Sequence, residues 1–196
     1  MDYSGDFAFA RHNLGNLYAN LHQPERSVEN YRAAIRIDNQ FFPAKVNLAM
    51  LYNQLGRKDE TEVLLREVVD AQPELYEVQY SLGLLLAEKK QYVAAARYLA
   101  AAADGMPDHA RVHYNLGMLL DFLQRDMAAK SALLRALELE PVNMQYLNAL
   151  AEFHLKRHRY REAKEIAERM RASHPLNRMG PDLLNYINRK LEADKQ

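Results

Sequence analysis

One short motif returns along this chain at multiples of 34 residues. The heptamers HNLGNLY, YSLGLLL and YNLGMLL share a central Leu-Gly pair, whose leucines are Leu14, Leu82 and Leu116. Leu82 comes 68 residues after Leu14, and Leu116 comes 102 residues after it. A fixed period of 20–50 residues is typical of stacked repeats rather than of a single globular core. The period therefore constrains the fold more than any other feature of the sequence.

The period extends over five consecutive segments without insertion or deletion. If Ala8 is position 1, we predict repeats at 8–41, 42–75, 76–109, 110–143 and 144–177. Position 7 is always leucine, namely Leu14, Leu48, Leu82, Leu116 and Leu150. Position 8 is Gly or Ala, and position 20 is small, namely Ser27, Thr61, Ala95, Ala129 and Ala163. Position 32 is proline in four repeats, namely Pro73, Pro107, Pro141 and Pro175, with Asn39 in the first.

Each repeat has the pattern of two short helices joined by a polar turn. In the third repeat, apolar residues at helical spacing surround the polar segment 88–91. Small residues at positions 8 and 20 allow two helix axes to approach closely, and proline at position 32 is expected to end the second helix. One helix pair cannot bury enough surface alone, so stacked pairs must share one core, in which we place the position-7 leucines. The sequence thus predicts an all-α solenoid of antiparallel helix pairs.

The pattern L-[G/A]-x2-Y, a small residue and then Pro at this period resembles the tetratricopeptide repeat (TPR) family. The resemblance covers residues 8–177 and implies a right-handed superhelix whose first helices line a concave, partner-binding face. Two departures are visible: position 4 holds no Trp, and position 11 is Tyr only in Tyr18 and Tyr52. We predict a C-terminal capping helix within residues 178–196, where Leu183, Leu184, Ile187 and Leu191 form one apolar stripe.

The N-terminal end differs from the C-terminal end in two ways. Tyr3, Phe7 and Phe9 cluster where an earlier repeat would pack, which predicts an open face that either continues upstream or self-associates. Residues 1–155 hold 15 Lys and Arg against 20 Asp and Glu (net −5), whereas residues 156–196 hold 11 against 6 (net +5). This split is either a chance imbalance on solvated helices or an electrically polar rod with an attractive tail.

No catalytic or metal-binding constellation is present. The absence of cysteine excludes disulfides, thiolate metal sites and covalent haem attachment within this chain. The pairs His109/His113 and His154/His158 have an i, i+4 spacing, but the first lacks the Glu of an H-E-x-x-H motif, and in the second we expect His154 in the packed core and His158 in a turn. The basic run at 156–164 is expected to be a solvated turn rather than a nucleic-acid site. We predict no enzymatic activity, catalytic residue, metal, cofactor or nucleic-acid partner.

Membrane and export signals are also missing from the sequence. No apolar run approaches the roughly 18–20 residues that span a bilayer. The first residues, MDYSGDFAF, lack the basic start and apolar centre of a signal peptide. We therefore expect a soluble protein with no membrane partner, which is cytoplasmic by default.

Asparagine recurs at position 6 as Asn13, Asn47 and Asn115. An amide both donates and accepts, so such a ladder can pair with a peptide backbone of any sequence. The ladder resembles the one in the superhelical arm of the peptide O-GlcNAc transferases, which implies binding of extended peptides; the alternative is that the amides only brace the repeats. The predicted groove is completed by His12, Asn16, Met50, Tyr80, Arg111, Tyr114, Met118 and Asp121. Arg111 would favour an acidic group on the ligand, and Asp121 would oppose one.

A second precedent within the family does not fit. Co-chaperone TPR domains clamp a C-terminal carboxylate with cations, but this chain has Glu77 and Ser81 where the third repeat should supply them. The predicted function is thus a non-catalytic protein–protein interaction module that binds an extended peptide or a partner helix. Two alternatives remain open: a self-assembling scaffold, and an accessory domain of a larger bacterial enzyme or multihaem redox protein.

Overall fold

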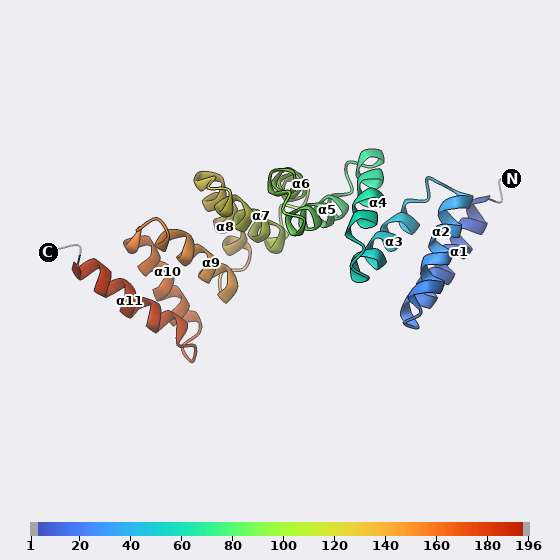
Figure 1. Ribbon diagram of the computed structural model, residues 1–196. Helices are drawn as coiled ribbons and strands as arrows, with labels where there is room; N and C mark the ends of the chain where they lie inside the picture. The colour runs from blue at the N-terminus through green and yellow to red at the C-terminus, as the bar shows by residue number, and fades with distance from the viewer. Residues whose placement is uncertain (1–3, 194–196) are drawn as a thin grey trace. The chain divides into compact units, whose positions relative to one another are not determined.

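The structure, a computed structural model, describes residues 4–193, which form eleven α-helices and no strand (Figure 1). The helices are α1 (Ser4–Asn20), α2 (Pro24–Ile37), α3 (Phe42–Gln54), α4 (Lys58–Ala71), α5 (Tyr76–Glu88), α6 (Tyr92–Gly105), α7 (Ala110–Phe122), α8 (Asp126–Leu139), α9 (Met144–Leu155), α10 (Tyr160–Ser173) and α11 (Met179–Ala193). They group into two compact units, one through Tyr98 and the other from Leu99, with the boundary inside α6.

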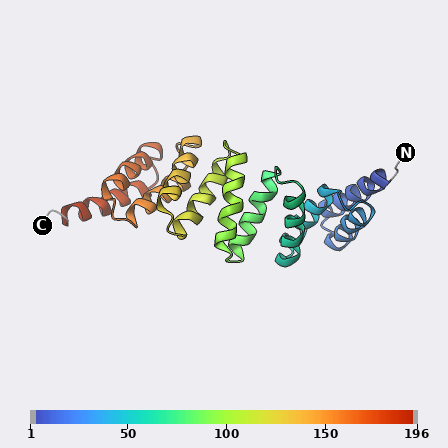
Figure 2. The ribbon, with the colours of Figure 1, turned by 90° about the horizontal axis from the view of Figure 1, so that it is seen from above.

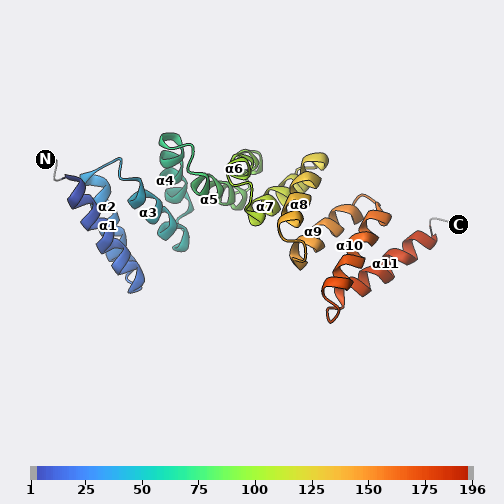
Figure 3. The same cartoon turned by 180° about the vertical axis from the view of Figure 1, so that it is seen from behind.

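The helices alternate between two kinds that both follow the 34-residue period. The A helices α3, α5, α7 and α9 begin at residues 42, 76, 110 and 144, and α1 precedes them. The B helices α2, α4, α6, α8 and α10 begin at residues 24, 58, 92, 126 and 160. Within a unit, each A helix lies beside the B helix that follows it, as α1 and α2 or α9 and α10 show in Figure 3. The prediction of an all-α solenoid of helix pairs is therefore confirmed.

A single left-handed residue closes every A helix. In the second repeat this residue is Gly56, with φ 74°, and it is flanked by two bonds of a Schellman motif: Gly56 N–H donates to Asn53 C=O at 3.0 Å, and Arg57 N–H donates to Tyr52 C=O at 2.8 Å. The equivalent residues elsewhere are His22, Lys90, Gln124 and His158, with φ between 54° and 61°. Because only one of the five is glycine, the residue type predicts the left-handed geometry once.

The small residues at positions 8 and 20 bring the two helices of a repeat together, as predicted. Ser27 Oγ donates to the carbonyl oxygen of Gly15 at 2.8 Å, and Thr61 Oγ1 donates to that of Ala49 at 3.3 Å. The position-20 side chains are all buried. A larger residue at either position would push the two helices apart, so the sequence constraint is steric.

The B helices end at equivalent residues whether or not proline follows. α4, α6, α8 and α10 stop two residues before a proline, and α2 stops at the same position although Asn39 replaces the proline. In both cases the next residue donates its N–H to the carbonyl four residues earlier, as Asp38 does to Ala34 at 2.9 Å. The expectation that proline ends the B helix is thus incomplete, because the chain leaves the helix at this point in its absence.

The core follows position 7, with one exception. Leu48, Leu82, Leu116 and Leu150 are at most 8% exposed, but Leu14 is 39% exposed. The expectation that all five leucines are buried is therefore wrong for Leu14. The reason is that α2 packs on α3, whereas no helix among residues 4–193 covers the equivalent face of α1.

The predicted open N-terminal cluster is only partly within the described residues. Phe7 and Phe9 are 64% and 56% exposed. Tyr3, the third member of the cluster, lies outside the described residues. The exposed side chains of α1 therefore include large apolar groups near its start.

The last helix covers the last repeat. Leu184 and Ile187 of α11 are buried against Ala163 and Ala167 of α10, with Leu183 and Leu191 at the edge of the contact. Figure 2 shows α11 in red beside α10. The side chains of Asp182, Asn185, Asn188 and Arg189 remain exposed, so the other face of α11 is polar. No helix within residues 4–193 is long and apolar enough to cross a bilayer.

Candidate functional site

Two adjoining hollows lie over the first three A helices. The first, of about 400 Å³, is lined by Asn16, Ala19, Asn20, Tyr31, Asn47, Met50, Leu51 and Gln54. The second, of about 250 Å³, is lined by Ala49, Met50, Asn53, Gln54, Thr61, Leu65, Ser81, Leu84, Leu85 and Glu88. Because Met50 and Gln54 line both, the hollows form one continuous surface depression, which we call the A-helix groove.

A hydrogen-bond network orients the amides of the first hollow. Asn47 Nδ2 donates to Asn16 Oδ1 at 2.8 Å and to His12 Nε2 at 2.9 Å. Tyr31 donates its hydroxyl to the same Asn16 Oδ1 at 2.7 Å. The imidazole of His12 packs between Tyr31 and Phe41, with ring centroids 5.8 and 5.4 Å away. Asn47 of the second repeat is thereby fixed against the first repeat.

The protonation states fit this network. An amide nitrogen can only donate, so His12 Nε2 is the acceptor and the ring must be neutral. Burial lowers the pKa of His12, which favours the neutral ring. Burial also raises the pKa of Tyr31, which keeps its hydroxyl protonated as the donor to Asn16.

The two amides of this network, Asn16 and Asn47, each leave one polar atom unused. Among residues 4–193, no group bonds to Asn16 Nδ2 or to Asn47 Oδ1, although the other polar atom of each amide is occupied. An extended peptide presents one carbonyl and one N–H per residue, and these need one donor and one acceptor. The arrangement therefore suits backbone recognition, while the bonds that Asn47 already makes also brace the two repeats.

The second hollow has apolar walls and a polar rim. Leu65, Leu84 and Leu85 supply the walls, and Ser81 and Glu88 stand at its edge. Glu88 is the only residue with an ionisable carboxylate or cation in the lining of either hollow, and Lys58 lies 3.0 Å from its Oε2. The groove thus offers amides and apolar surface but no cation.

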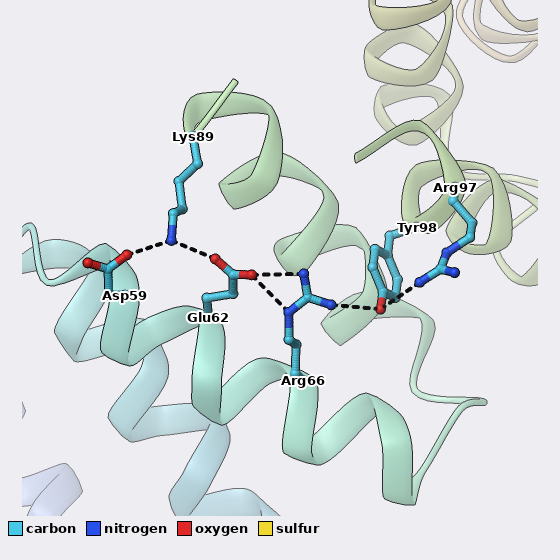
Figure 4. A network of polar contacts seen from close by, with 6 residues as sticks. All are labelled: Asp59, Glu62, Arg66, Lys89, Arg97 and Tyr98. Carbon is cyan, nitrogen blue, oxygen red and sulfur yellow. Dashed lines mark hydrogen bonds and ion pairs between the residues drawn. The ribbon is translucent and has the colours of Figure 1, made fainter. Parts of the chain in front are cut away.

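An ion-pair network links α4 to the end of α5, two of the three helices that line the second hollow (Figure 4). Lys89 Nζ lies 2.5 Å from Asp59 Oδ1 and 2.6 Å from Glu62 Oε2. Glu62 also pairs with Arg66 at 2.8 Å, and Arg66 donates to the hydroxyl of Tyr98 at 3.3 Å. Lys89 holds the pKa of both carboxyl groups below their usual values. A shared cation of this kind fixes geometry more than it adds stability, because exposed pairs contribute only about 0–1 kcal/mol each.

In the second unit, one of the predicted groove residues, Tyr114, lies in a contact between repeats. The ring of Tyr114 stacks on that of Tyr146, with the ring centroids 5.0 Å apart. Gln145 Nε2 donates to the hydroxyl of Tyr114 at 3.2 Å. The exposed Arg111 lies 6.0 Å from the Tyr114 ring. Asn115 and Met118 are half-buried on the same helix, α7.

Asp121 is held by two cations. Its carboxylate lies 2.9 Å from Lys156 Nζ and 2.7 Å from Arg157 Nη1, and its side chain is 8% exposed. Arg157 also pairs with Asp126. Two cations of the basic run at 156–164 therefore bind the preceding repeat, and Asp121 is neutralised within the protein instead of opposing an acidic ligand.

The structure brings together only part of the predicted site. Asn16, Asn47 and Met50 line the A-helix groove, whereas His12 supports Asn47 from beside it. Asn13 and Tyr80 line neither hollow. The lining residues missed from the sequence include six at positions 9, 12 and 13 of their repeats, namely Ala19, Asn20, Asn53, Gln54, Leu84 and Glu88. Asn16 and Met50 of the predicted set also occupy position 9, so the period could have identified Leu84.

Two family models match the chain, and both describe the tetratricopeptide repeat. One matches residues 10–41 and 110–143, and the other matches residues 44–72. No curated protein sequence matches the chain.

Solved structures share the fold at low sequence identity. A MamA protein superimposes with a TM-score of 0.81 at 15% sequence identity, and the alignment covers 89% of this chain and 94% of the MamA chain. MamA from Desulfovibrio magneticus RS-1 gives 0.77 at 22% identity, covering 89% and 97%. YrrB, described as a TPR protein with an unusual peptide-binding site, gives 0.78 at 19% identity, covering 96% and 92%.

The repeat matches and the helix pairs together define the class: the chain belongs to the tetratricopeptide repeat family and has a TPR solenoid fold. Proteins of this family are generally non-catalytic interaction modules. The repeat matches accordingly place this chain among the protein–protein interaction modules.

Proposed function

We propose that the A-helix groove binds an extended segment of a partner protein. The observation that carries the proposal is the pre-oriented pair of unused groups, Asn16 Nδ2 and Asn47 Oδ1, beside a hollow with apolar walls. Each backbone hydrogen bond contributes a net ~0.5–1.5 kcal/mol. The peptide-binding site described for YrrB supports this use of the fold. The chain acts by binding alone, through five repeats at 8–41, 42–75, 76–109, 110–143 and 144–177 and the cap that follows them.

The chemistry of the groove selects the kind of segment. An apolar side chain of the ligand fits against Leu84 and Leu65 in the second hollow, and its backbone pairs with the amides of the first. No cation lines the groove, so a C-terminal carboxylate has no partner there. Uncharged segments are therefore preferred, because Glu88, the one carboxylate of the lining, is already paired with Lys58. In the second unit we keep Arg111, Tyr114, Asn115 and Met118 as proposed contacts, and we withdraw Asp121 because its carboxylate is already paired.

Changes in the groove should weaken peptide binding without unfolding the protein. The probe is a dodecapeptide selected against the full chain from a random-peptide phage library. Met50→Lys places a charge where both hollows meet, and Asn47→Ala removes the amide network, so we expect each to weaken the affinity about tenfold or more, equivalent to about 1.4 kcal/mol. Fluorescence anisotropy measures the affinity, and circular dichroism checks the fold.

Asn13→Ala is the matched control. Asn13 occupies position 6 like Asn47, but it is exposed and lines neither hollow, so its replacement should leave the affinity unchanged. Equal losses in Asn13→Ala and Asn47→Ala would contradict the proposed site, as would selected peptides whose binding ignores Met50→Lys.

A second candidate function, self-association, rests on the uncovered face of α1. Leu14 and Leu17 are 39% and 50% exposed, whereas Leu48 and Leu51, at the same positions of the next repeat, are 2% and 8% exposed. Counting Phe7, Ala10 and Leu21, the exposed apolar residues of this face are spaced alternately three and four residues apart, as in a coiled-coil seam. Such a stripe is self-complementary in a two-fold dimer. The proposed occupant is α1 of a second copy.

Sedimentation equilibrium tests this candidate. We expect the wild type to form dimers and the variant Leu14→Glu/Leu17→Glu to remain monomeric. The control is Met127→Glu, which should still form dimers, because Met127 lies on α8 and not on α1 and is 83% exposed. An apolar seam should persist at high salt, whereas pairing between the −5 and +5 segments should weaken as the Debye length falls. A monomer at every concentration and salt would eliminate self-association.

A further inference from the structure

A separate trough lies between the B helices α2 and α4. It has a volume of about 350 Å³, and its apolar lining comes from Ile35, Leu48, Val63 and Leu64. Val63 is 57% exposed, so apolar surface of the trough is open to a ligand. None of these four residues lines the A-helix groove, so the trough is a distinct surface.

Two unpaired cations stand at the edge of the trough. Arg32 and Arg36 lie one turn apart on α2, and both are exposed. Among residues 4–193, neither has an acidic side chain within ion-pair distance, although Arg66, the equivalent of Arg32 in the next repeat, pairs with Glu62. Val28 replaces that glutamate in the first repeat.

The repeat period shows that this charge pattern is specific to the first repeat. The residues equivalent to Arg36 are Asp70, Asp104, Glu138 and Ala172. Three of the four other repeats therefore carry the opposite charge at this position. The remaining charged residue of the lining, Glu60, is neutralised by Arg57, whose Nη2 lies 2.5 Å from its Oε1. The trough thus presents net positive charge beside apolar surface.

A buried hydroxyl in the wall lacks a partner. Tyr52 is 3% exposed and lines the trough, and its hydroxyl has no hydrogen-bond partner among the described residues. The guanidinium carbons of Arg57 and Arg32 lie over its ring, at 4.1 and 5.8 Å from the centroid. Both are long, flexible side chains that can move towards a bound anion, and an acceptor brought in by that anion would satisfy the hydroxyl.

We propose that this trough is a second binding site, which takes an acidic segment of a partner protein with an aliphatic side chain between its carboxylates. The aliphatic group covers Ile35, Val63 and Leu64, and the carboxylates pair with Arg32 and Arg36. A protein segment is favoured over a small amphiphile because the trough is open, whereas small ligands bury most of their surface. The chemistry is opposite to that of the A-helix groove, which has no cation.

The test uses the ¹⁵N-labelled full chain and three dodecapeptides. The first carries two leucines flanked by glutamates, the second replaces the glutamates by lysines, and the third replaces the leucines by serines. We expect only the first to shift the amide signals of Ile35, Val63 and Leu64, and to bind at least tenfold more weakly to Arg32→Glu/Arg36→Glu. Arg125→Glu/Arg161→Glu is the matched control, because both arginines are exposed in the second unit and should not affect binding.

Four results with the peptides would overturn the proposal. They are equal binding of the lysine peptide, equal binding of the serine peptide, shifts confined to Met50 and Leu84 of the A-helix groove, and no shift at about 1 mM peptide, which corresponds to about −4.1 kcal/mol. Decanoate that shifts the same signals at lower concentration than the peptide would assign the trough to a small amphiphile instead. Asn47→Ala separates the two sites, because it should weaken groove binding while binding in the trough is unchanged.

Discussion

Leu82→Ala is expected to lower the free energy of unfolding by about 2–5 kcal/mol. Leu82 is fully buried at position 7 of the third repeat, and truncation leaves a cavity that neighbouring repeats cannot fill without moving. Because a solenoid depends on contacts between neighbours, the loss should also broaden the unfolding transition. Urea denaturation followed by circular dichroism measures both effects.

Leu14→Ala provides the control within the same period. Leu14 occupies the same repeat position, but it is 39% exposed, so we expect a loss of less than about 1 kcal/mol in a monomer. If both substitutions cost the same at low protein concentration, the face of α1 must be covered in solution, and the explanation for the difference between Leu14 and Leu82 would fail.

Gly15→Ala is expected to destabilise the protein although helix propensity alone predicts a gain of about 1 kcal/mol. A Cβ atom at Gly15 would lie 2.5 Å from Cδ1 and Cε1 of Tyr31. The ring cannot move away freely, because it is 3% exposed and its hydroxyl donates to Asn16. Overpacking of this kind costs about 1–3 kcal/mol. Because Tyr31 also lines the first hollow, peptide binding should weaken in the same variant.

The natural repeats supply the partner substitution for a double-mutant cycle. In the second repeat, Ala49 and Leu65 occupy the positions of Gly15 and Tyr31, and both are buried without conflict. Gly15→Ala should therefore cost much less in a Tyr31→Leu background than in the wild type. An equal cost in the two backgrounds would show that the close approach to the Tyr31 ring is not the cause.

Much of the fold could be predicted because the same local demands recur in five repeats. Leucine at position 7 and small residues at positions 8 and 20 specify how one helix pair packs. Because the same residue types recur in five repeats, this pattern can be distinguished from chance. The turn geometry was less accessible. Lys90 and Gln124 adopt the left-handed conformation because the capping hydrogen bonds of their turns impose it. The residue type predicts this conformation only at Gly56.

The candidate site was predicted in part, for a related reason. The period identified Asn16, Asn47 and Met50, whose repeat positions face the groove. The same period suggested equal roles for Asn13 and Asn47, yet only Asn47 has a neighbouring repeat whose His12 and Asn16 accept its two bonds. The position of a residue in the repeat specifies which face of the helix its side chain is on, but its hydrogen-bond partners depend on the adjacent repeat.

The sequence by itself determined the helix pairs, their 34-residue period and the family. These follow from steric rules that act within a few turns of one chain segment. The tertiary structure alone decided which equivalent residues differ: Leu14 is exposed where Leu82 is buried, and Asp121 is neutralised by Lys156 and Arg157. Exposure and ion pairing depend on which groups from other repeats occupy the surrounding space, and a residue's own position in the pattern does not contain that information.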